Sequence, residues 1–190
     1  MFILLKIIFT NFIYLIFGKV LINFFFKKSY SFHLAEMAIY GTILISFFAL
    51  IINFFFPLNN LTNSIFLLIP ILFIHSYKFI TKKDLKFIFF SSIFAFLLLI
   101  FSKINTPDAG LYHLPFVQIL NENKLIVGLN NLHFRFGHIS IIQYLSAINY
   151  NFINGVEGIL IPLASLAVFI LLYFYQEIKE FLKSDKSLNI

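Results

Sequence analysis

Hydrophobic residues occur in this chain as long runs, separated by short polar links and by one longer polar segment. A helix that crosses a membrane needs about 20 consecutive, predominantly apolar residues. Five runs reach or approach that length, and they cover residues 2–26, 37–56, 65–80, 87–101 and 158–175. The pattern therefore predicts an all-α fold, a polytopic helical membrane protein with about five transmembrane helices.

Two of these runs have unusual features. The third is short and contains Pro70, while the first carries Lys6 and Lys19 close enough to its ends for both side chains to snorkel to the membrane surface. The first run has no small-residue cleavage site, so we expect a retained anchor and not a removed signal peptide.

Composition supports the membrane interpretation and excludes other classes. Hydrophobic residues make up 61% of the chain and charged residues 12%, whereas a soluble domain has about 25% charged residues. Cysteine is absent, which excludes thiol catalysis, disulfides and cysteine metal sites. The net charge of +6 resides largely in short lysine clusters between apolar runs. That distribution is typical of membrane topology, so we expect membrane lipid as a partner and no nucleic acid.

The lysine clusters also predict an orientation. Lys27 and Lys28 follow the first run, four lysines lie between Lys78 and Lys86, and three more follow the fifth run. The positive-inside rule places these links in the cytoplasm. We therefore expect four transmembrane helices within residues 1–102, an extracytoplasmic loop at 103–155, and a fifth helix with a basic cytoplasmic tail at 156–190.

The polar segment has its own local signals. Thr106, Pro107 and Asp108 form a helix-start signal for a helix running toward Asn121, which Pro115 would kink or divide. Residues 132–136 alternate between apolar and polar, as an extended chain does. From residue 138 to 152 the apolar positions recur at helical spacing, and this predicts an amphipathic helix in the membrane interface.

Candidate chemistry gathers in the same segment. Asp108 follows the fourth run at the expected depth of lipid headgroups, where a carboxylate could act as a general base. Tyr112 would lie one helical turn further on, with His113 to its side. A helix cap at Asp108 and an interfacial anchor at Tyr112 explain the same spacing equally well.

His113, His133 and His138 match no spacing of metal ligands, so we expect hydrogen-bonding histidines, no protein-bound metal and no cofactor. Arg135 is the single arginine of the chain, and its guanidinium group suits bidentate binding of a phosphate, with Lys124 as a looser partner. An arginine that merely reaches lipid phosphates would look the same in the sequence.

The motif from Asp108 to Pro115, DAGLYHLP, resembles the first external loop of GT-C glycosyltransferases. The run from Asp108 to Tyr144 is similar to a group of uncharacterised bacterial polytopic membrane proteins that look GT-C-like. The resemblance implies a bacterial inner-membrane enzyme that transfers a sugar from a polyprenyl-phosphate donor in cell-envelope polysaccharide assembly. Asp108 matches the position of the acidic base and is our catalytic candidate. Tyr112 and His113 match the motif. The candidates for substrate binding are Tyr112, His113, His133, Arg135 and His138.

Two features differ from that family. Asp108 is followed by Ala109, where related mannosyltransferases carry a second acidic residue, and only one apolar run follows the loop. We therefore expect the chain to be the N-terminal part of a longer enzyme, inactive alone. The alternative is a non-catalytic integral membrane protein, either a transporter fragment or an assembly partner in polysaccharide export.

Overall fold

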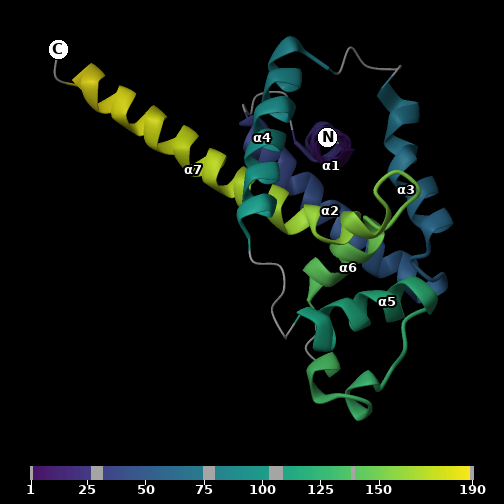
Figure 1. Ribbon diagram of the computed structural model, residues 1–190. Helices are drawn as coiled ribbons and strands as arrows, with labels where there is room; N and C mark the ends of the chain where they lie inside the picture. The colour runs from purple at the N-terminus through teal and green to yellow at the C-terminus, as the bar shows by residue number, and fades with distance from the viewer. Residues whose placement is uncertain (1, 27–31, 75–79, 103–108, 138–139, 189–190) are drawn as a thin grey trace.

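The computed structural model describes residues 2–26, 32–74, 80–102, 109–137 and 140–188, and it is helical with no strand in those ranges (Figure 1). The long helices are α1 (Phe2–Phe25), α2 (Leu34–Phe55), α3 (Asn60–Ile74), α4 (Lys82–Phe101) and α7 (Ile161–Leu188). The predicted all-α class is confirmed.

Four helices are long and apolar enough to cross a membrane, namely α1, α2, α4 and the helical stretch Gly155–Lys183, which includes most of α7. The third predicted span corresponds to α3, and the 15 residues that the structure describes there are fewer than a membrane crossing requires. Large apolar side chains are exposed along the long helices, as a lipid environment allows.

Helices α1 and α2 pack closely because each has a glycine at their crossing. A Cβ atom added to Gly18 would lie 1.7 Å from the carbonyl oxygen of Met37, and one added to Gly41 would lie 1.8 Å from that of Tyr14. Only a residue without a side chain lets the two backbones approach so far. The pair forms the centre against which α4 and α7 pack (Figure 1).

Two ion pairs hold opposite ends of α1. The ammonium of Lys19 lies 2.5 Å from the carboxylate of Asp84 in the first turn of α4, and that of Lys6 lies 2.6 Å from Glu157, before α7. The snorkelling predicted for both lysines is therefore replaced by pairing within the protein. Asp84 also completes a capping box with Thr81.

These contacts sort the helix ends into two groups. The start of α1, the end of α2 and the start of α3 contact the polar segment, because Lys6 reaches Asn154, Asn53 reaches Leu120, and Asn63 reaches Ala147. At the opposite end of the bundle, His33 before α2 contacts Glu180 in the last part of α7. There, too, Asp84 at the start of α4 contacts Lys19 near the end of α1. The described helices thus alternate between two ends of the bundle.

Candidate functional site

The polar segment folds into short helices packed under the ends of the long ones (Figure 1). They comprise the π-helix Ala109–His113, α5 (Leu114–Glu122), the 3-10 helices Leu129–Asn131, Phe134–Gly137 and Gly155–Ile159, and α6 (Ile141–Ile148). Pro115 lies in the first turn of α5, directly after the π-helix, and the two helices follow each other without a break. The helix therefore changes type next to Pro115 and does not end there.

The predicted extended run at 132–136 is wrong. Phe134–Gly137 forms a 3-10 helix, and the N–H of Phe136 donates to the carbonyl of His133 at 2.9 Å. With no neighbouring strand among the described residues, the backbone satisfies its polar groups locally. Side chains three residues apart then eclipse, so the rings of His133 and Phe136 lie 5.4 Å apart on one side.

The predicted helix at 138–152 is shorter than expected. Ser140 and Gln143 form a capping box at its start, and α6 ends at Ile148. Leu145 and Ile148 of the predicted apolar stripe are buried, but Phe152 lies beyond the helix end and is exposed. Burial raises the pKa of the Tyr144 hydroxyl, so this group stays protonated at physiological pH.

Two separate parts of the polar segment meet at Tyr112 and Arg135. The guanidinium carbon of Arg135 lies 4.6 Å from the centre of the Tyr112 ring, and the His113 ring is 4.3 Å from the same ring. The backbone N–H of Arg135 donates to Nδ1 of His133 at 3.3 Å, which fixes the base of the arginine. We call Tyr112, His113, His133 and Arg135 the Tyr112–Arg135 cluster.

The cluster rests on a buried aromatic side chain and stays accessible. The ring of Phe136 packs 5.8 Å from that of Phe116, which is buried in the core. Tyr112 and Arg135 are half-buried, and His113 is exposed. A guanidinium group stacked on an aromatic face keeps its planar N–H donors, which can bind an anion.

Other predicted site residues do not join the cluster. Asp108 and His138 lie outside the described residues, so their expected roles stay predictions. Tyr112 precedes α5 and Lys124 follows it. Because α5 has nine residues, its two ends are about 14 Å apart at 1.5 Å per residue, so Lys124 is not a partner of Arg135. Within the described ranges, no three histidine or acidic side chains gather closely enough to hold a metal ion.

Asparagine side chains, which the sequence analysis did not single out, position the polar segment. Asn63 of α3 donates to the carbonyls of Leu58, Ala147 and Tyr150 at 2.6, 2.9 and 2.6 Å. Asn121 of α5 donates to the first two of the same carbonyls. Turn composition predicts such residues in loops, but no local signal tells which of them reach across the fold.

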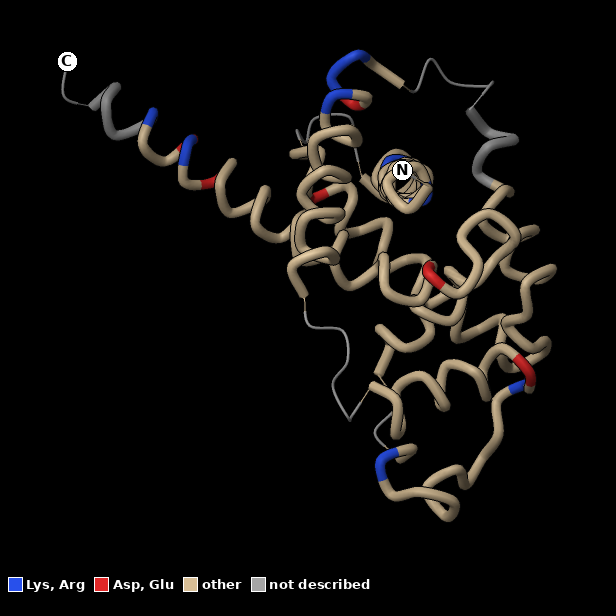
Figure 2. The backbone as a smooth tube through the Cα atoms, in the orientation of Figure 1, with Lys and Arg blue, Asp and Glu red and all other residues tan. Residues whose placement is uncertain are grey.

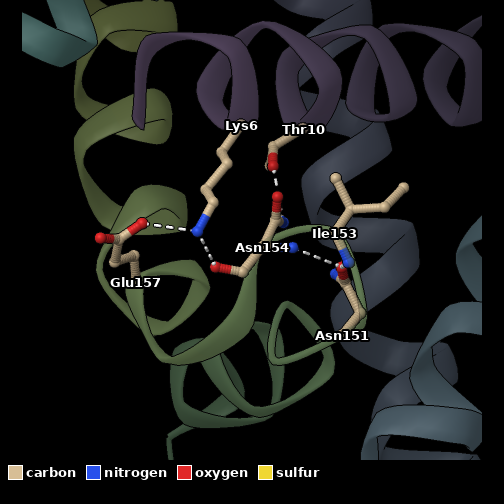
Figure 3. A network of polar contacts seen from close by, with 6 residues as sticks. All are labelled: Lys6, Thr10, Asn151, Ile153, Asn154 and Glu157. Carbon is tan, nitrogen blue, oxygen red and sulfur yellow. Dashed lines mark hydrogen bonds and ion pairs between the residues drawn. The ribbon is translucent and has the colours of Figure 1, made fainter. Parts of the chain in front are cut away.

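A second polar network ties the end of the segment to α1 (Figure 3). The side chain of Asn154 donates to the Thr10 hydroxyl at 3.0 Å, and the backbone carbonyl of Asn154 accepts from Lys6 at 2.9 Å. Oδ1 of Asn151 accepts from the backbone N–H groups of Ile153 and Asn154. The network orients the turn that leads into α7.

An apolar groove of about 290 Å³ lies between α4 and α7 and is lined by side chains such as Phe94, Leu98 and Leu171. It lies on the half of α4 that leads to the Asp108 segment. Its lining suits a hydrocarbon chain.

Compared with known proteins, the family model described as a domain of unknown function, DUF8201, matches residues 1–190. No curated protein and no solved structure matches the chain.

Proposed function

Because the chain belongs to the DUF8201 family, a domain of unknown function, we propose its function from its own residues: it is part of a membrane enzyme that transfers a sugar from a polyprenyl-phosphate donor. The observation that carries the proposal is the stacking of Arg135 on Tyr112, 4.6 Å from the ring centre. The cluster is the phosphate-binding side of the site.

Charge and position support this assignment. The guanidinium group of Arg135 presents several N–H donors in a plane that matches a phosphate. Stacking on Tyr112 holds that plane in one orientation, which lowers the entropy lost when an anion binds. Asp108, four residues before Tyr112, serves in this proposal as the base that takes the proton of the acceptor hydroxyl.

The groove between α4 and α7 supports a lipid-linked donor. Its lining is apolar, and a prenyl chain there would leave its phosphate at the loop end of α4, where the Asp108 segment begins. Charge and hydrocarbon would then be bound by different parts of the chain, as an amphipathic donor requires.

The test uses the full-length protein in membranes and measures sugar transfer from polyprenyl-phosphate donors. We expect Tyr112→Phe to retain the ring and most of the activity. Arg135→Gln should raise KM about tenfold or more, because a charged hydrogen bond contributes about 1.5–3 kcal/mol. Tyr112→Leu should raise KM in the same direction, because it removes the ring that orients Arg135. Asp108→Asn should lower kcat instead.

Three outcomes would contradict the proposal. Equal KM values for Tyr112→Phe and Tyr112→Leu would remove the role of the stacked ring. Unchanged turnover in Asp108→Asn would remove the base. Absence of transfer with every polyprenyl-phosphate donor, in a protein that is folded and inserted, would favour the non-catalytic alternative of an assembly partner.

A further inference from the structure

The C-terminal half of α7 leaves the bundle and projects beyond the other helices (Figure 1). Phe174, Ile178 and Leu182 are all exposed there, at 56, 59 and 56% of their surface. Successive residues of an α-helix are turned by about 100°, so these three side chains lie within an arc of about 80°. We call this arc the α7 stripe.

Acidic and basic residues alternate along the projecting part of α7 (Figure 2), and helix geometry places the two kinds on different sides. On one side, Glu177 and Glu180 turn toward the start of α2, and their Oε1 atoms lie 3.6 and 3.4 Å from Nε2 of His33. These contacts fix the rotation of α7 about its axis. Glu180 is turned by about 160° from Ile178, so the α7 stripe faces away from the protein.

Lysines lie on the other side of the stripe. The ammonium of Lys179 lies over the ring of Tyr175, 5.9 Å from its centre, and Lys183 follows one turn later on the exposed surface. A helix with an apolar stripe flanked by lysines is typical of a segment that lies in the membrane interface. The carboxylates, which an anionic surface would repel, are held on the side of His33.

We propose that the last turns of α7 lie in the headgroup region of an anionic membrane leaflet, with the α7 stripe in the acyl boundary and Lys179 and Lys183 on lipid phosphates. Two observations favour lipid over protein as the occupant. The stripe continues the exposed apolar face of a membrane-spanning helix, and the charges beside it complement anionic headgroups. This inference does not depend on the proposed function.

The test uses single-cysteine variants of the full chain, which has no native cysteine. Ile178→Cys and Leu182→Cys carry an environment-sensitive fluorophore on the stripe, and Lys183→Cys carries it on the polar side as the matched control. Each protein is reconstituted in vesicles of phosphatidylcholine alone and in vesicles that also contain phosphatidylglycerol. In the anionic vesicles we expect lipid-borne nitroxides to quench positions 178 and 182, and aqueous iodide to quench position 183.

Removing the lysine charges tests the electrostatic part. With the probe at position 178, Lys179→Gln and Lys183→Gln should each lower the ratio of buried to exposed probe about fivefold in anionic vesicles, as expected from about 1 kcal/mol per lysine near such a surface. In neutral vesicles the same changes should have little effect.

Two results would overturn the proposed membrane location, and a third would overturn its anionic preference. One is iodide quenching at positions 178 and 182 as strong as at 183 in anionic vesicles. The other is energy transfer between differently labelled chains together with protection from lipid nitroxides, which would show that a second copy covers the stripe. A lysine response equal in both vesicle types would refute the anionic preference.

Discussion

At the residue scale, asparagine carries many of the contacts between distant parts of this chain. Asn53, Asn63 and Asn121 each donate from their side-chain N–H groups to backbone carbonyls in distant parts of the chain, near the ends of α5 and α6. Asn63 reaches three carbonyls from two segments. A carbonyl left unpaired and away from water costs about 1–3 kcal/mol, so such side chains stabilise the packing of the polar segment against α2 and α3.

Replacing Asn63 tests this role. We expect Asn63→Ala to lower the stability of the folded protein by about 2–4 kcal/mol, because it leaves the Tyr150 carbonyl without this donor and weakens two others. Asn63→Asp keeps the shape but removes both donors, so it should be at least as damaging. Thermal unfolding in detergent measures the effect, and Asn130→Ala at an exposed position is the control. A stability loss in Asn63→Ala no larger than in the control would contradict the assignment.

At the scale of elements, the close contact between helices α1 and α2 depends on two glycines, Gly18 and Gly41. Helices α1 and α2 make the most extensive pairing in the fold, and both Gly18 and Gly41 lie against the backbone of the opposite helix. Within a membrane, association of helices depends on such close packing, since lipid is as apolar as the helices themselves. The two glycines are therefore needed because of where they lie against the opposite helix.

The sign of a glycine substitution makes this testable. In an isolated helix, Gly→Ala stabilises by about 1 kcal/mol. For Gly18→Ala and Gly41→Ala we expect the opposite, a loss of about 1–3 kcal/mol or more from overpacking, because the added methyl group overlaps a carbonyl. Gly110→Ala meets no atom within 4 Å and serves as control. Unfolding temperatures in detergent that rise for Gly18→Ala would refute the close crossing.

At the scale of the whole molecule, the buried pair of Lys19 and Asp84 connects α1 with α4, and the two residues are 65 positions apart in the chain. Only 14% of the lysine side chain and 4% of the aspartate side chain are exposed. A buried charge is tolerated when it is paired, and removing one partner leaves the other uncompensated. The pair therefore fixes the register of α1 against α4.

A double-mutant cycle separates pairing from simple loss of a charge. We expect Lys19→Met or Asp84→Asn alone to cost about 3–5 kcal/mol, and the double variant to cost less than either, because it removes both charges. Asp84→Asn retains an oxygen that can accept from the Thr81 N–H. The half-exposed pair of Lys6 and Glu157 is the control, with Glu157→Ala costing at most about 1 kcal/mol. Additive losses at Lys19 and Asp84 would show that the two charges are not coupled.

The helical class and the approximate limits of α1, α2 and α4 were readable from the sequence, but α7 continues to Leu188, well past the predicted end of the fifth span at residue 175. Apolar runs of membrane-spanning length can form few structures other than helices, and Pro115 and Ser140 have local effects at helix starts that do not need the rest of the fold. For the candidate site, the sequence singled out Tyr112 and Arg135 by residue type but assigned Arg135 a partner, Lys124, that lies past the far end of α5.

What the sequence alone determined about this protein is its helical membrane character, because hydrophobicity and period are properties of neighbouring residues. The tertiary structure decided which polar groups meet: Lys19 with Asp84, Asn63 with three carbonyls, and Arg135 with Tyr112. It also replaced the expected extended run at 132–136 by a 3-10 helix. Such pairings join segments far apart in the chain, and their free energy depends on burial and geometry that only packing creates.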